Sequence, residues 1–277
     1  MILVAGATGT VGRHVVEQLA AEGHPVRALT RKPGDARFPA NVEVAQGSLT
    51  DLATLPAALA GVRAVYLLAH GDRPADLFDL VKQAGVGQVV LLSTGFVDDT
   101  ADVQPNAIAA RHRPFELAAH DAGLAATFLR PTEFANNALQ WAPQIAAGDV
   151  VRGPYGAAQT APIHEHDLAE VAVRVLVDGG PAGGLALTGP ESLSHADQAR
   201  LIGDAIGRDI RFEDLPPEVW REQASRYAPA AVIDAVLGAL AGAVDRPAEV
   251  SPVVAQILGR PARAFADWAR DHANDFR

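Results

Sequence analysis

Three glycines near the start of the chain are the residues whose spacing most clearly implies chemistry. Gly6, Gly9 and Gly12 stand within Gly-Ala-Thr-Gly-Thr-Val-Gly, between an apolar run and an amphipathic segment. The first permits a tight turn, the second lets the backbone approach a pyrophosphate, and the third allows a helix to pack closely on a strand. The N–H groups that begin this helix attract phosphates. The pattern therefore predicts dinucleotide binding, with a turn that holds no ligand as the alternative.

Two basic residues favour one of the two nicotinamide cofactors. Arg31 and Lys32 follow the second apolar run, where an NAD site carries an acidic residue for the ribose 2′-hydroxyl. Cations at this position suit a 2′-phosphate, and an arginine can also lie over the adenine ring. We therefore expect NADPH, although an ordinary solvated basic turn would have the same composition.

The elements that must position these residues alternate along the first half of the chain. Each apolar run is short and apolar almost throughout, as expected for strands buried on both faces. These runs cover residues 2–5, 25–30, 42–45, 64–69, 88–93 and 126–130. Helical periodicity separates them, as in Val11, Val15 and Leu19, and in Leu117 with the alanines beside it. This alternation predicts an α/β fold, a Rossmann-type doubly wound parallel sheet.

The pattern loosens after residue 131, and the remainder predicts a smaller, mostly helical C-terminal lobe. Helices are expected at 167–177 and 194–206, and strands at 185–188 and 209–213. We expect an NADP-binding domain over residues 1–150, to which part of 160–190 returns, and a substrate-binding lobe over 151–277. That lobe should pack against the carboxyl ends of the strands, where such sheets place their ligands.

Composition excludes several classes of protein. The chain has no cysteine, which excludes disulfides, zinc–thiolate sites and thiol nucleophiles. Its net charge is -10 and its longest basic cluster is Arg111-His112-Arg113, so we expect no nucleic-acid partner. No apolar run reaches the ~18 residues of a membrane helix, and the first apolar stretch lacks the basic flank of a signal peptide. We expect a cytoplasmic protein with no membrane partner, and its oligomeric state stays open.

Several segments together resemble the atypical short-chain dehydrogenase/reductase superfamily, in its NmrA-like NAD(P)H-binding branch. The segments are the glycine loop, Leu92-Ser93-Thr94, Phe128 to Phe134 with Asn136-Asn137, Ala161 to Ala169, and Leu187 to Glu191. The resemblance spans most of the chain. That branch holds NADPH-dependent quinone and azo-type reductases, reductases that tailor aromatic natural products, and non-catalytic redox sensors.

The resemblance also implies which residues form the site. The cofactor would contact Gly6, Thr8, Gly9, Thr10, Val11, Gly12, Arg31 and Lys32, with Gly47 and Ser48 near the adenine. Leu68, Ala69 and His70 would line the nicotinamide ribose, and Ser93, Thr94, Pro131, Thr132 and Phe134 would surround the nicotinamide. A flat substrate would lie among Phe96, Phe134, Asn137, Trp141 and Tyr155. The alternative for these aromatic residues is a core between the lobes.

The tyrosine and lysine that standard members use for ketone reduction are missing. The tyrosines are Tyr66, Tyr155 and Tyr227, none has a lysine four residues later, and the only lysines are Lys32 and Lys82. Ketone reduction creates an alkoxide that needs a proton donor, whereas quinone reduction creates a delocalised phenolate that needs far less help. The site therefore suits a quinone or a conjugated aromatic substrate.

A histidine occupies the position at which related reductases have the lysine of this pair. Alignment on Glu116 places His112 there and Ile108 at the tyrosine position. His112 is our candidate catalytic residue because it could hydrogen-bond the ribose or donate a proton near neutral pH. A surface histidine is the alternative.

The predicted function is NADPH-dependent hydride transfer to a quinone or conjugated aromatic substrate, in aromatic natural-product tailoring. The alternative is a non-catalytic NADP(H) redox sensor that controls a partner protein. An isomerase or epimerase is disfavoured because that chemistry normally needs the tyrosine base.

The segment His164-Glu165-His166-Asp167 also suggests a metal site. Two histidines at i and i+2 share a side only on a strand, and no further ligand is evident. Asp167 is better explained as the N-cap or first turn of the following helix. We therefore expect no metal.

Overall fold

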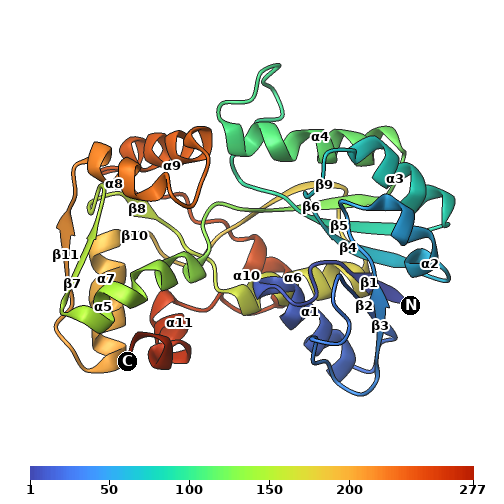
Figure 1. The fold of residues 1–277 in the computed structure, drawn as a ribbon, viewed down its shortest axis with the longest axis horizontal. Helices are drawn as coiled ribbons and strands as arrows, with labels where there is room; N and C mark the ends of the chain where they lie inside the picture. The colour runs from blue at the N-terminus through green and yellow to red at the C-terminus, as the bar shows by residue number, and fades with distance from the viewer.

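Short apolar segments form one parallel sheet within one lobe of a computed structural model, which describes residues 1–277 (Figure 1). The strand order is β3-β2-β1-β4-β5-β6-β9, and every neighbouring pair is parallel. The strands are β1 (Ile2–Val4), β2 (Val26–Thr30), β3 (Val42–Gln46), β4 (Ala64–Leu68), β5 (Gln88–Leu92), β6 (Ala126–Pro131) and β9 (Gly183–Leu187). This order confirms the predicted Rossmann-type doubly wound fold, with its reversal between β1 and β4.

Helices cover both faces of the sheet because side chains along each strand alternate between two cores. Ile2 and Val4 belong to a cluster with α1 and α6, whereas Leu3 belongs to a cluster with α2, α3 and α4. The bounds of these helices are α1 (Thr10–Ala21), α2 (Leu55–Leu59), α3 (Pro74–Gln83), α4 (Ala107–Asp121) and α6 (Glu165–Asp178).

Two expectations about burial were wrong. Strand β3 is half exposed rather than buried on both faces, because it is the outermost strand and pairs only with β2. Leu117 is 45% exposed, because Phe115 and Ala119, one helical turn apart, form the buried face of α4. In both cases the residue type predicted burial. The position of the strand in the sheet, or of the residue on the helix, leaves the side chains exposed instead.

A second lobe lies beside the sheet, with α6 and α10 between the two (Figure 1). Two small sheets pair β8 with β10 and β7 with β11. Trp141, Ile202, Phe265, Trp268 and Phe276 are among the residues of its core. The elements are α5 (Ala142–Ala147), β7 (Val150–Gly153), β8 (Gln159–Thr160), β10 (Leu193–Ser194), α7 (His195–Ile206), β11 (Arg211–Asp214), α8 (Pro217–Ala224), α9 (Ala230–Gly242), α10 (Val253–Leu258) and α11 (Phe265–Asp271), with 3-10 turns at Ala135–Trp141 and Ala273–Phe276. A further 3-10 turn, Leu52–Thr54, precedes α2 in the sheet lobe.

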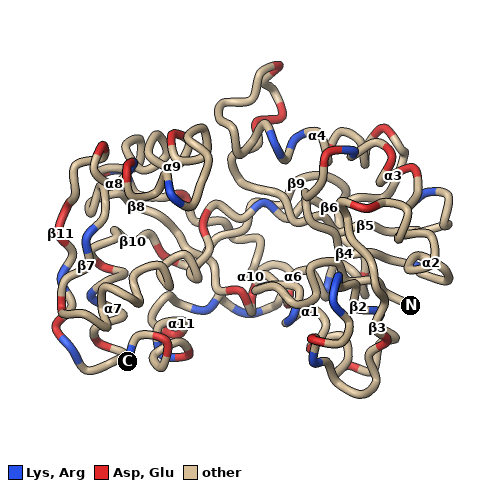
Figure 2. Tube along the Cα trace, in the orientation of Figure 1, with Lys and Arg blue, Asp and Glu red and all other residues tan.

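The chain crosses between the lobes more than once. Strand β9 pairs with β6, and α6 packs on α1, although both follow residue 151. The division into domains at residue 150 stays a prediction. Basic and acidic residues are interspersed over both lobes (Figure 2). No helix of the structure is both long and apolar enough to cross a membrane.

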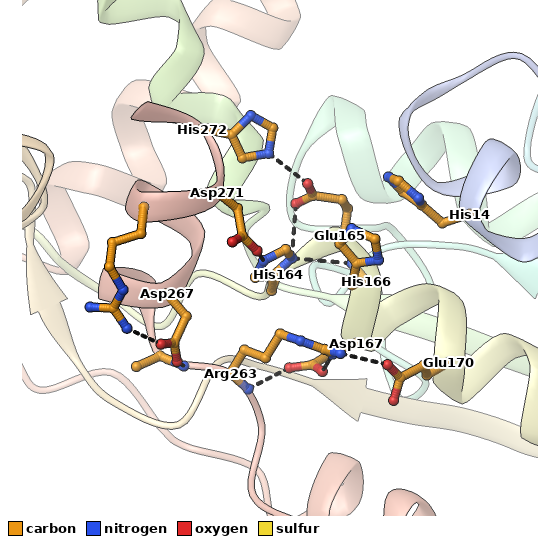
Figure 3. A network of polar contacts seen from close by, with 12 residues as sticks. His14, His164, Glu165, His166, Asp167, Glu170, Arg263, Asp267, Asp271 and His272 are labelled. Atoms are coloured by element: carbon orange, nitrogen blue, oxygen red, sulfur yellow. Dashed lines mark hydrogen bonds and ion pairs between the residues drawn. The ribbon is translucent and has the colours of Figure 1, made fainter. Parts of the chain in front are cut away.

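A buried carboxylate at the start of α6 fastens the C-terminal segment to the sheet lobe (Figure 3). His164 is the N-cap, and its side chain accepts a hydrogen bond from the His166 N–H, so Asp167 lies in the first turn. Asp167 is fully buried and accepts from Arg260 Nη2 at 2.7 Å, from the Arg263 backbone N–H at 2.5 Å and from the Arg263 guanidinium. These contacts hold residues 260–263 against α6.

Replacing this carboxylate should destabilise the fold. We expect Asp167→Asn to lower the free energy of unfolding by about 2–3 kcal/mol. This loss is smaller than the usual cost of breaking a buried ion pair, because Arg260 and Arg263 are both partly exposed to solvent. Urea denaturation measures this change. The matched control is Asp204→Asn, whose exposed partner Arg200 lies 3.0 Å away on the same helix, and it should change stability by less than about 0.5 kcal/mol. Equal losses in the two variants would contradict this role for Asp167.

Candidate active site

The glycine loop after β1 has a geometry that side chains would prevent. Gly6 has φ +62°, a region that favours glycine, and the Gly9 N–H donates to the Gly6 carbonyl at 2.8 Å. A Cβ at Gly12 would stand 2.2 Å from the same carbonyl oxygen. The loop and the first turn of α1 therefore pack backbone against backbone.

The N-terminus of α1 is suited to an anion. Its N-cap is Gly9, and no side chain accepts a hydrogen bond there. The first N–H groups of a helix have no partner within the helix, so they are free to bind phosphate oxygens. This open helix end and the glycine backbone fit the pyrophosphate of a dinucleotide.

A groove of about 510 Å³ extends from this loop to the end of β2. Arg31 and Lys32 line it, and both are exposed. The Lys32 ammonium lies 4.0 Å from the Asp35 carboxylate, with both side chains more than three-quarters exposed, so this ion pair is weak. Both cations are therefore available to a 2′-phosphate. Gly6, Thr8, Gly47 and Ser48 line the same groove, as the sequence predicted.

A second pocket of about 650 Å³ adjoins this groove. Leu68 and His70 line both, so the two spaces meet at the end of β4. The predicted residues Ala69, Ser93, Thr94, Phe96, His112, Pro131, Thr132, Phe134 and Asn137 also line the second pocket. Gly9, Thr10, Val11 and Gly12 line neither space and contribute the loop and the first turn of α1 instead.

Two predicted substrate residues lie elsewhere. Trp141 is 5% exposed, packs edge-on against His195 and Phe212, and lines a third cavity of about 380 Å³ in the second lobe. Tyr155 lines none of these three spaces. Trp141 also belongs to the core of the second lobe, and its role as a substrate residue stays a prediction.

Sequence reasoning missed one whole wall of the pocket. Val236, Ala239 and Leu240 of α9, with Ala243 after it, supply apolar side chains to this wall. The signal in the sequence was the run of alanine, valine and leucine over residues 230–242. A helix formed by this run has apolar side chains on more than one face, so one face can pack on the core while another lines a pocket. The C-terminal lobe therefore supplies one wall of the pocket.

The hydroxyl of Ser93 is already engaged. It donates to Glu116 Oε1 at 2.6 Å, and Glu116 is 1% exposed. Arg130 binds the same carboxylate and, with Arg113, binds Asp99. The hydrogen bond from Arg130 holds the pKa of Asp99 below its ordinary value. The network ties the end of β5 to α4 and β6, and it leaves Ser93 no proton for a substrate.

His112 lies in the pocket wall as a partly buried residue. Its Nδ1 stands 2.8 Å from the Ile108 carbonyl oxygen, so Nδ1 carries the proton and donates it. Burial holds the pKa of His112 below its ordinary value. The neutral ring offers Nε2 as an acceptor, which suits contact with a hydroxyl group better than proton donation. His112 stays a proposed site residue in that role.

No tyrosine or lysine can form the usual reductase pair. Tyr66 is fully buried in the sheet, where burial raises the pKa of its phenol. Tyr227 is 89% exposed, Tyr155 lines neither the groove nor the pocket, and Lys32 and Lys82 are exposed. The sequence-based exclusion of that chemistry therefore agrees with the geometry.

One carboxyl group in the pocket was not foreseen as a site residue. Glu133 follows Pro131 and Thr132 at the end of β6 and lines both the 650 Å³ pocket and the neighbouring cavity. Burial raises the pKa of Glu133 above its ordinary value, and hydrogen bonding with Thr160 and Asn137 opposes part of that shift. The only signal in the sequence was an acidic residue within an otherwise apolar family segment.

Comparisons with known proteins agree with this geometry. Residues 6–179 match the model of a family described as NAD(P)H-binding. A protein of Streptomyces griseus named (4-alkanoyl-5-oxo-2,5-dihydrofuran-3-yl)methyl phosphate reductase is 39% identical, over 100% of this chain and 99% of its own. An NAD(P)H azoreductase of Xenophilus azovorans is 34% identical with the same coverage. The resemblance to the NmrA-like reductases is thereby confirmed.

A solved structure is similar over nearly the whole chain. It is an NADPH-dependent quinone oxidoreductase of Escherichia coli in complex with NADPH, 25% identical, with a TM-score of 0.81. The similarity covers 98% of this chain and 99% of that one. These similarities support NAD(P)H-dependent reductase activity.

The two cations after β2 should determine the preference between cofactors. We expect Arg31→Ala/Lys32→Ala to raise the Kd for NADPH at least ~100-fold, since each charged hydrogen bond contributes about 1.5–3 kcal/mol. The Kd for NADH should change less than ~5-fold, because NADH carries no 2′-phosphate and loses only the contact of Arg31 with the adenine ring. Fluorescence titration with each cofactor measures both constants. Lys82→Ala, which removes the other exposed lysine, is the control, and an equal loss of NADH binding in the double variant would refute the assignment.

Proposed function

The chain belongs to the NAD(P)H-binding family, and we propose that it is an NADPH-dependent reductase of quinones and related conjugated carbonyl compounds. The observation that carries this proposal is the open pocket of about 650 Å³ that adjoins the dinucleotide groove. A redox sensor without catalysis has no need of such a space beside its cofactor. The open pocket therefore favours an enzyme over a sensor.

The residues of the pocket suit a flat acceptor. Phe96 and Phe134 come from the sheet lobe, and Val236 and Leu240 come from α9. Together they hold apolar rings and keep water from the reacting atoms. When bound, NADPH supplies a hydride from nicotinamide C4. The task of the chain is to place the acceptor against that face and to provide for the charge that develops on its oxygen.

Glu133 is the proposed proton donor. Hydride addition to a conjugated acceptor leaves a negative charge on the acceptor oxygen, and one proton completes the two-electron reduction. Glu133 lies in the pocket, and burial raises the pKa of its carboxyl group. It therefore keeps its proton to a higher pH than an ordinary glutamate does. It donates this proton to the substrate and regains one from solvent. Glu133 supplies this one proton, but the chain still lacks the lysine-assisted tyrosine that stabilises a localised alkoxide.

Arg111 is proposed to bind an anionic substituent of the substrate. Its guanidinium lines the pocket, contacts His70 Nδ1 at 3.3 Å and pairs with no carboxylate. The Streptomyces griseus relative is named for a phosphate ester of an unsaturated lactone. An unpaired arginine at the mouth of an apolar pocket fits such a molecule, since Arg binds phosphate with two parallel hydrogen bonds. We propose that a phosphorylated conjugated lactone is a better substrate than a neutral one.

Turnover with a panel of acceptors tests this function. NADPH oxidation should accompany simple quinones and alkanoyl-substituted unsaturated lactones, and it should be absent with a saturated ketone, whose alkoxide product needs more stabilisation. The phosphate ester of a lactone should have a lower KM than the free alcohol. Arg111→Ala should abolish that difference while leaving the alcohol unaffected. Tight NADPH binding with no turnover across the panel would favour the sensor.

The pH profile tests the proton donor. We expect kcat to fall as pH rises through the pKa of Glu133, because only the protonated carboxyl donates. Glu133→Gln should lower kcat by about 100-fold, at the low end of general acid catalysis, and should flatten the profile with little change in KM. The control is Glu249→Gln, an exposed carboxylate of the same pocket, which should keep the normal profile. An unchanged profile in Glu133→Gln would exclude this residue as the donor.

A further inference from the structure

Three potential metal ligands converge where α1 meets α6, outside the two spaces of the reductase site (Figure 3). His14 comes from the second turn of α1, and Glu165 and His166 come from the first turn of α6. Their ligand atoms all lie within 4.8 Å of one another, and the rings of His14 and His166 are 4.0 Å apart between centroids. The two helices run in the same direction, since the Glu22 and Arg174 side chains form an ion pair near their other ends.

One oxygen of the Glu165 carboxylate has no hydrogen-bond donor. The side chain is 3% exposed, and Oε1 is 2.7 Å from His272 Nε2. Oε2 is buried and unpartnered, although His164 Nδ1 stands 3.2 Å away. That nitrogen accepts the His166 backbone N–H at 3.2 Å, so the His164 proton resides on Nε2, which faces Asp271 at 3.3 Å. A buried carboxylate oxygen that faces a lone pair is unfavourable unless a cation occupies the space beside it.

His14 is in the tautomer that a metal ligand requires. Its Nδ1 lies 3.1 Å from Glu17 Oε2 and donates its proton there, which leaves the lone pair on Nε2. A metal-bound histidine commonly donates its other N–H to a carboxylate in this way. The remaining contact of Nε2 is Arg13 Nη2 at 3.5 Å, and Arg13 is an exposed side chain that can turn away. His166 has no hydrogen bond to its ring and is partly exposed, so an ion can reach the cluster.

We propose that His14, Glu165 and His166 bind a divalent transition-metal ion such as Zn²⁺. The ligands are His14 Nε2, a ring nitrogen of His166 and Glu165 Oε2, and a water molecule completes a tetrahedron. Two imidazoles with one carboxylate suit zinc, whereas calcium and magnesium take oxygen ligands almost exclusively. The negative charge of the Glu165 carboxylate stabilises the cation, which the two neutral imidazole rings cannot do by charge.

The ion would join three parts of the chain. It bridges α1 to the start of α6, and His272 beyond α11 contacts its carboxylate ligand. Sequence reasoning rejected a metal here because it considered His164 with His166. The structure explains why that pair is not the site: both nitrogens of His164 already have partners, and the missing ligand is His14, about 150 residues earlier in the chain.

Metal titration of the full-length protein tests the proposal. After treatment with a chelator and its removal, the protein should bind one Zn²⁺ per chain in competition with a chromophoric chelator. His166→Asn and His14→Asn should each weaken Zn²⁺ binding at least ~100-fold. Mutation of a residue that only hydrogen-bonds to a metal ligand already lowers metal affinity about 10–100-fold, and loss of the ligand itself should lower it more. Zn²⁺ should raise the unfolding midpoint of the unaltered protein and of neither variant.

The controls separate this site from weak binding at the surface. His24→Asn and His120→Asn alter histidines outside the cluster and should keep the affinity. Co²⁺ bound to the unaltered protein should give the intense visible absorption of a tetrahedral complex, a measurement that needs no variant. Absence of stoichiometric binding, an octahedral Co²⁺ spectrum, or full affinity in folded His166→Asn would each overturn the proposal.

Discussion

The contact between Gly12 and the Gly6 carbonyl determines where α1 begins, and much of the molecule depends on it. A side chain at Gly12 would collide with that oxygen, so only glycine lets the helix start so close to β1. The position of α1 then directs its free N–H groups toward the groove that ends at Arg31 and Lys32. It also places the buried side of α1 against α6, the helix that leads from the second lobe into β9 of the sheet.

The reductase pocket exists because the two lobes meet over the carboxyl ends of the strands. The sheet lobe provides the polar and aromatic residues that follow β4, β5 and β6, and α9 provides the apolar cover. Charge in this region is largely neutralised by internal pairing, as the contacts of Glu116 with Ser93 and Arg130 show. Against that background Glu133 and Arg111 are notable, because neither is consumed by an ion pair. The proposed chemistry follows from these two groups.

The contacts around the start of α6 tie the C-terminal segment to the sheet lobe. Asp167 binds Arg260 and Arg263, while Glu165 faces His272 (Figure 3). Buried ionic contacts of this kind contribute little net stability compared with apolar packing, but losing one partner is costly. Their effect here is to specify where residues 260–272 dock against the start of α6.

The sequence by itself determined the alternation of strands and helices in the first half of the chain, the glycine loop, the basic turn after β2 and the absence of a tyrosine–lysine pair. Those features are local: turn sterics, periodicity and residue type are readable within a few neighbouring positions. Only the tertiary structure decided that β3 is an exposed edge, that Trp141 belongs to the core of the second lobe, and that Glu133 lies in the pocket. It also brought His14 to Glu165 and His166. Such outcomes depend on contacts between segments far apart in the chain, and residue patterns carry no record of which segments will meet.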